Sequence, residues 1–131
     1  MKYHERARDL EYQLALAQGL EVTYMASSGT VWVLGSDGQL TWRPRPAHDV
    51  ADCINLMLEV GVWPREIRFA AGAAFEVVDV AGNVRCVETI LHGDDKKVAM
   101  MLAVVAGAID VLLERKDNAA VPAATSSAVS A

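Results

Sequence analysis

The sequence predicts an α+β fold whose elements follow in the order helix–three strands–helix–three strands–helix. Residues 20–24 and 65–69 share one pattern of apolar and polar side chains, and each follows a helix-like segment. After each come a turn of small residues, an extended run, a second tight turn and another extended run. A pattern that repeats in this way indicates a fold built of two similar units. We expect helices on both faces of a mainly antiparallel sheet, which is a three-layer α/β/α sandwich.

The chain is expected to form a single domain over residues 1–117, built of two similar helix-plus-three-strand units and a closing helix. With 131 residues, of which 53% are hydrophobic, it can bury enough surface to fold without a metal or a disulfide. Residues 118–131 are mainly Ala, Ser and Val, with no charge and no amphipathic pattern. Such a composition is typical of a disordered tail.

Charge and cysteine usage narrow the classes of partner. The net charge of −5 disfavours general binding to nucleic acid or to an anionic membrane, which requires an excess of Lys and Arg. Cys53 and Cys86 lie in apolar runs without a CxxC spacing, as expected for free thiols in a reducing compartment. The N-terminal residues lack the apolar stretch of a secretory signal. We therefore expect a cytoplasmic protein.

The first two helices are expected over residues 3–18 and 48–60. Each has apolar residues at helical spacing: Tyr3, Ala7, Leu10, Leu14 and Ala17 in the first, and Val50, Cys53, Ile54, Met57 and Leu58 in the second. Gly19 and Gly61 stand where a left-handed residue commonly ends a helix. Pro64 prevents the second helix from continuing.

Six strands are expected, over residues 21–26, 30–35, 39–43, 66–71, 74–80 and 84–91. The pair Asp37-Gly38 favours a hairpin turn between the second and third strands, since a type I′ turn needs two positive φ values. Polar and apolar residues do not alternate cleanly in the last three strands, as is typical of a sheet covered on both faces. Asp79, just before a turn, suggests a bulge.

The third helix is expected over residues 95–114, with Asp94 or Asp95 as its N-cap. Residues 98–109 contain no polar side chain. The apolar stretch is too short for a bilayer, which requires about 20 residues, and it contains the carboxylate of Asp110. We therefore expect it to be the most buried element, enclosed by the rest of the fold or by a second subunit.

Candidate ligand-binding residues stand at the expected starts of the second and third helices, namely His48, Asp49, His92 and Asp94. Imidazole and carboxylate groups could converge there on a metal or a small ligand. Alternatively, the Asp residues cap the helices and the histidines are exposed. Capping explains the positions without a further assumption, so we expect no metal and no cofactor, and the ligand site is the weaker alternative.

Nucleic-acid binding and catalysis have little support in the sequence. Trp and Arg gather in residues 42–45 and 63–68, a combination that could suit a single-stranded nucleic acid. However, the four Arg within residues 42–68 are balanced by four acidic residues. No nucleophile motif and no Gly-rich phosphate loop is found. We therefore expect a protein that is not an enzyme.

Three segments carry a resemblance to a known family. Residues 14–22 read as a helix that ends at Gly and leads into a strand, and residues 42–54 as a strand, a Pro-containing loop and an Asp-led helix. Residues 86–95 read as a closing strand that leads into the Ala-rich helix. Together they resemble the phage ABA-sandwich domain, a family of small phage and prophage proteins, over about residues 9–114. The resemblance implies helices on both faces of a mainly antiparallel sheet and carries over no catalytic residue.

These observations favour a non-enzymatic accessory protein of phage or prophage type that acts through protein–protein contacts. A homodimer is one form that such contacts could take, because the third helix has no polar face and the chain has three tryptophans. The alternative is a small-ligand or metal-binding protein or an enzyme, with its site at the N-termini of the second and third helices.

Overall fold

The computed structural model describes residues 2–20, 22–25, 30–34, 40–42, 45–70, 72–90 and 95–120. Its elements are α1 (Lys2–Ala17), β1 (Val22–Met25), β2 (Thr30–Leu34), β3 (Leu40–Trp42), α2 (Val50–Val60), β4 (Val62–Phe69), β5 (Gly72–Asp79), β6 (Val84–Ile90) and α3 (Lys96–Ala120). The expected α+β class, with three helices and antiparallel sheet, is therefore confirmed.

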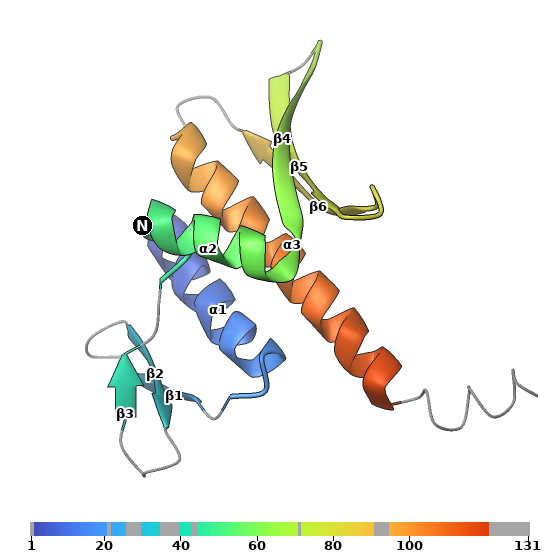
Figure 1. Ribbon diagram of the computed structural model, residues 1–131. Helices are drawn as coiled ribbons and strands as arrows, with labels where there is room; N and C mark the ends of the chain where they lie inside the picture. Colours follow the sequence, from blue (N-terminus) through green and yellow to red (C-terminus); the bar gives the residue numbers. More distant parts are fainter. Residues whose placement is uncertain are drawn as a thin grey trace, which may run out of the picture.

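The long helix α3 is the centre of the fold. It runs diagonally through the molecule and packs against α1, α2 and the sheet of β4, β5 and β6 (Figure 1). Its buried side chains are Ala99, Met101, Leu102, Ala103, Val104, Val105, Ala108, Ile109 and Val111. The rest of the chain thus encloses the apolar helix, and no second subunit is needed to cover it. None of the described helices is long and apolar enough to cross a membrane.

The two shorter helices add one apolar stripe each to the same core. Leu10 and Leu14 of α1 and Cys53 and Leu56 of α2 are buried in the cluster that α3 dominates. Both helices end as the sequence predicts, because Gly19 has φ 78° and Gly61 has φ 84°. Glycine adopts this left-handed conformation without steric cost.

The strands form two separate sheets. One has the order β1-β2-β3 and the other β4-β5-β6, and every pairing is antiparallel. α1 contacts β1 and β2, whereas α3 contacts β4, β5 and β6, and the described parts of the two sheets do not contact each other. Figure 1 shows them on opposite sides of the helices. A single sheet between two helical layers, as expected for the sandwich, is therefore not confirmed.

The sheet of β4, β5 and β6 has a helix on one face. Phe75 and Val77 of β5 are buried in the core that α3 dominates. Because side chains alternate along a strand, Trp63, Arg65, Ile67 and Phe69 of β4 lie on the opposite face. We call this opposite face the outer face of the sheet. The expectation of helices on both faces is not met by the described elements.

Two element boundaries and the position of a bulge differ from the sequence-based expectation for identifiable physical reasons. β4 begins at Val62 and includes Pro64, which an edge strand tolerates. α3 continues to Ala120, so the first residues of the expected tail are helical. Near this end, Arg115 donates to the carbonyl of Val60 at 2.9 Å. The bulge lies in β6 and not at Asp79, because Val77 pairs with Cys86 and Val78 with Val84. The Asp37-Gly38 turn lies outside the described residues.

Candidate functional site

A buried carboxylate, that of Glu11 in α1, gathers donors from the segment before α2. Its Oε2 accepts a hydrogen bond from the backbone N–H of Ala47 at 3.1 Å and lies 3.0 Å from Nδ1 of His48. Its Oε1 lies 3.5 Å from Nε of Arg45. The Glu11 side chain is only 6% exposed, and a buried carboxylate without donors would be costly. We call Glu11, Arg45 and His48 the Glu11 cluster; it ties α1 to the start of α2.

His48 is held by protein groups at both ring nitrogens. Nε2 lies 3.2 Å from Nη2 of Arg45, and Nδ1 faces the carboxylate of Glu11. Since a carboxylate only accepts, the network assigns the Nδ1 proton to the bond with Glu11. In the neutral ring, Nε2 then accepts from Arg45. The expectation that this histidine is exposed is wrong, because its side chain is 20% exposed.

Asp49 is the N-cap of α2. Its backbone is extended, with φ −124° and ψ 125°, and its side chain accepts from the backbone N–H of Asp52 at 3.0 Å. Asp52 in turn accepts from the backbone N–H of Arg45 at 2.9 Å. The capping interpretation is confirmed at this position. The carboxylate satisfies a donor that the helix leaves unpaired.

At the start of α3 the structure describes Asp95 but not His92 or Asp94. Asp95 accepts from the backbone N–H of Lys97 at 2.9 Å, and its carbonyl accepts from Ala99 at 3.0 Å, so it caps α3. Whether His92 and Asp94 approach His48 and Asp49 lies outside the described residues. Among those that are described, no three His, Cys, Asp or Glu side chains are grouped to hold a metal.

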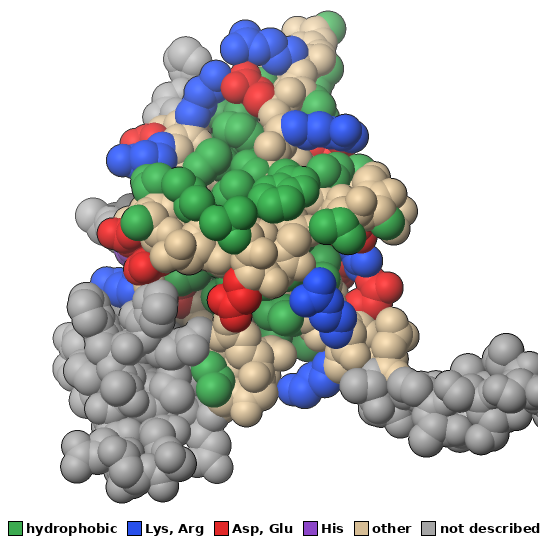
Figure 2. All heavy atoms as spheres, viewed as in Figure 1, with side chains coloured by type: hydrophobic (Ala, Val, Ile, Leu, Met, Phe, Trp, Pro, Cys, Tyr) green, Lys and Arg blue, Asp and Glu red, His purple; other side chains and the backbone are tan. Residues whose placement is uncertain are grey.

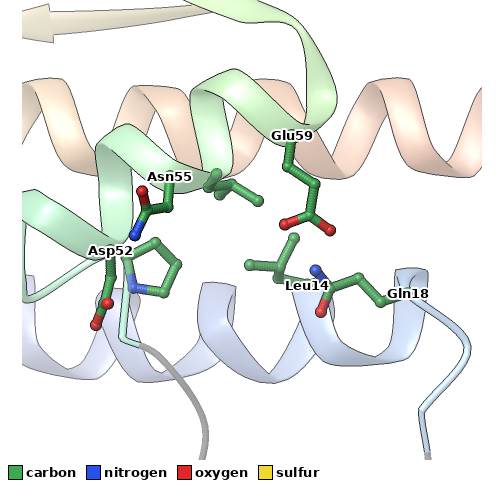
Figure 3. A pocket seen from close by; sticks show the side chains of 7 residues that line it. Leu14, Gln18, Asp52, Asn55 and Glu59 are labelled. Atoms are coloured by element: carbon green, nitrogen blue, oxygen red, sulfur yellow. The ribbon is translucent and has the colours of Figure 1, made fainter.

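A small cleft lies between α1 and α2. Its volume is about 150 Å³, and it is lined by Leu14, Gln18, Pro46, Asp52, Asn55, Leu56 and Glu59. Figure 3 shows Glu59 of α2 and Gln18 of α1 extending toward each other across it. Sites for drug-sized ligands usually measure about 300–1,000 Å³, so this cleft suits at most a very small molecule. Neither His48 nor Asp49 lines it.

A second polar cluster joins the sheet to α3. Arg85, the extra residue of the β6 bulge, donates from Nε to Asp79 at 2.8 Å and from Nη1 to Asp110 at 3.1 Å, and it pairs with Glu114. These carboxylates, Glu114 first, raise the pKa of Arg85. Hydrogen bonds from the backbone of Asn83, from Arg85 and from the backbone of Ala81 hold the pKa of Asp79 below its usual value. All three carboxylates thus pair with the one guanidinium group of Arg85.

The two cysteines do not form a reactive pair. Cys53 is completely buried in α2, and burial raises the pKa of its thiol to about 11. Burial also raises the pKa of Cys86, which is half-buried in β6. Because the thiolate is the reactive form, neither side chain has the depressed pKa of a catalytic cysteine. The expectation of free thiols is confirmed.

A group of exposed apolar side chains on α2 and β4 is not explained by the ionic clusters described above. On α2, Ile54 is 45% and Leu58 67% exposed, and at the base of β4 Trp63 is 40% exposed. Figure 2 shows a band of hydrophobic side chains across the middle of the molecule, over α2 and the lower part of β4. We call Ile54, Leu58 and Trp63 the α2 patch. Single exposed apolar residues are ordinary, whereas large groups of them are common at interaction sites.

The outer face of the sheet continues the α2 patch through Trp63. Its exposed apolar residues include Phe69 at 50%, Val84 at 47% and Val87 at 55%. In the middle of this face, Arg65 donates from Nε to Glu76 at 2.7 Å across the strand pair. The sequence did not indicate this surface, because the poor alternation of polar and apolar residues in these strands suggested a sheet covered on both faces.

Comparison of the chain with models of protein families, with curated proteins and with solved structures found no match.

Proposed function

We propose that this protein is a non-enzymatic accessory protein of phage or prophage type that acts in the cytoplasm by binding another protein. The α2 patch together with the outer face of the sheet supports this proposal, because both expose large apolar side chains that a folded chain normally covers. The likeness of residues 9–114 to the phage ABA-sandwich domain supplies the biological setting.

The hydrophobic gain from such a contact is appreciable. Complete burial of a fully exposed side chain of the size of Leu contributes about 1.5–3 kcal/mol. Leu58, of which 67% is exposed, can gain about two-thirds of that amount in a contact, and Trp63, of which 40% is exposed, can gain a smaller part of its own burial energy. Aromatic residues at the centre of an interface often dominate the binding energy. Leu58, which is 67% exposed, and Trp63 are therefore the residues whose replacement should weaken binding most.

The test is affinity capture with matched variants. Purified wild-type protein, Leu58→Glu and Leu113→Glu would be used to capture partners from phage-infected or lysogenic bacterial cells. Leu113 is the control, because it is also exposed, at 47%, but lies near the far end of α3. We expect a partner in stoichiometric amount with wild type and Leu113→Glu, and at least tenfold less with Leu58→Glu.

Two results would contradict the proposal. One is equal capture by Leu58→Glu and the wild type. The other is an equal loss of capture with both variants, because binding would then not depend on the α2 patch. A photo-crosslinking residue at position 58 adds a direct readout, since it should form a covalent adduct with the partner and a residue at position 113 should not.

The alternative function, a small-ligand or metal-binding protein with its site at His48, Asp49, His92 and Asp94, has weaker support. His48 is bonded to Glu11 and Arg45, and Asp49 is used as a helix cap. A thermal shift on addition of zinc that disappears in the double variant His48→Ala/His92→Ala would revive this alternative. The absence of any shift would end it.

A further inference from the structure

The partner of the outer face can be specified further, on the basis of the function proposed above. We propose that this face binds a second copy of the same chain about a two-fold axis, so that Arg65 of each copy pairs with Glu76 of the other. The interface would consist of the apolar residues on both sides of these two charges.

The charges of the outer face favour a second copy as its partner. Arg65 and Glu76 are cross-strand partners in the middle of the outer face, and they already form an ion pair within one chain. By strand alternation they are the only charged residues of β4, β5 and β6 on this face in the described structure. A face with one adjacent charge of each sign complements itself, because a two-fold rotation brings each Arg65 near the other Glu76. An acidic or a basic partner would match only one of the two.

The apolar side chains on both sides of this pair also favour a second copy. Trp63 precedes Arg65 on the same face of β4, and Ile67 and Phe69 follow it. On β6, Val84 and Val87 are both exposed. Two such faces stacked on one another would bury apolar rows against apolar rows, as in sheets that pack about 10 Å apart. The four charges would be enclosed by them, where an unpaired or like-charged contact is most costly.

Pairing along the edge strand β4, another way for sheets to associate, is disfavoured. β4 is an edge strand, and edge strands can pair with those of another copy. Pro64 lies within β4 and provides no backbone N–H, and Arg68 at its far end is 77% exposed. Proline and charge on an edge strand are the features that oppose such pairing. Contact through the face is therefore a better route than pairing along β4.

A charge-exchange experiment tests the inference on the full chain. Sedimentation velocity over a range of concentrations would compare wild type, Arg65→Glu, Glu76→Arg and an equimolar mixture of the two variants. The single variants face like charges in a two-fold dimer, so each should dissociate at least tenfold more readily than wild type. The mixture restores opposite charges across the interface and should form a heterodimer as tightly as the wild-type dimer.

The control is Arg68→Glu, which reverses an exposed charge on the same strand but not on the outer face, and it should leave the dimer unchanged. If a charge variant fails to fold by circular dichroism, Val87→Lys replaces it and should also weaken the dimer. A wild-type monomer at every concentration, or a mixture no tighter than the single variants, would overturn the second copy as partner. The proposed function would then still stand or fall by the capture experiment with Leu58→Glu.

Discussion

At the scale of single residues, Gly107 sets the distance between α3 and the sheet. A Cβ atom at this position would lie 2.6 Å from Cγ1 and 3.0 Å from Cβ of Val77, a side chain that is completely buried. Replacing glycine by alanine inside a helix usually stabilises it by roughly 0.5–1 kcal/mol. Here we expect the opposite sign, with Gly107→Ala lowering the free energy of unfolding by about 1–3 kcal/mol through overpacking.

Urea denaturation would measure this change, and a second substitution identifies its cause. In a Val77→Ala background the added methyl group has space, so Gly107→Ala should cost much less there than in the wild type. A Gly107→Ala variant as stable as wild type would show that α3 can move away from β5 without cost.

Some single residues of the candidate site can be predicted from the sequence and others cannot. Asp49 and Asp95 act as caps, as their positions before amphipathic runs indicate, because capping depends only on local backbone geometry. The role of Glu11 could not be predicted, since its partners Ala47 and His48 come from a distant segment. In sequence, Glu11 is simply one of several polar residues on a helix.

At the scale of elements, the turn between β5 and β6 makes the stability of the fold depend on pH. Asp79 accepts hydrogen bonds from the backbone of Asn83 and Ala81, each at 2.9 Å, and pairs with Arg85. These contacts lower its pKa in the folded state relative to about 3.9 in the unfolded chain. The unfolded state therefore binds more protons between the two values. The stabilisation is complete above about pH 5 and is lost as the pH falls through the folded pKa.

We accordingly expect Asp79→Asn to lower the melting temperature at neutral pH. Below about pH 4 the difference in melting temperature between this variant and the wild type should become smaller. Thermal denaturation at a series of pH values would give both curves. Asp9→Asn, which changes an exposed carboxylate of α1, is the control and should follow the wild type closely. Parallel curves for Asp79→Asn and wild type down to pH 2 would contradict the assignment.

The elements themselves are mostly predictable from local signals, whereas their assembly is not. Gly19 and Gly61 end α1 and α2 as expected, because a left-handed residue favours glycine in any context. By contrast, the division of the strands into two sheets depends on which strands meet α1 and which meet α3. The extension of α3 to Ala120 also depends on tertiary contacts. Arg115 donates to the carbonyl of Val60, and Lys116 donates to the carbonyl of Leu16.

At the scale of the whole molecule, α3 is the element on which the others depend. It contacts α1, α2, β4, β5 and β6, and its buried residues form the largest share of the common core. None of these contacting elements can leave α3 without exposing apolar surface. Domains of this size with one shared core usually unfold in a single cooperative step. We therefore expect α2 and α3 to separate only when the whole domain unfolds.

Cys53 provides a direct measurement of that cooperativity. It lies in α2, is completely buried in the common core, and has a pKa raised to about 11, so its thiol should not react in the folded state. In a Cys86→Ala background, labelling of Cys53 by a thiol reagent across a urea titration should follow the same transition as the helical circular dichroism signal. Labelling that is complete at lower urea than this transition would show that α2 detaches first, because local opening exposes a thiol before global unfolding does. The domain would then consist of α3 and its sheet as one cooperative unit and α2 as a second, weaker one.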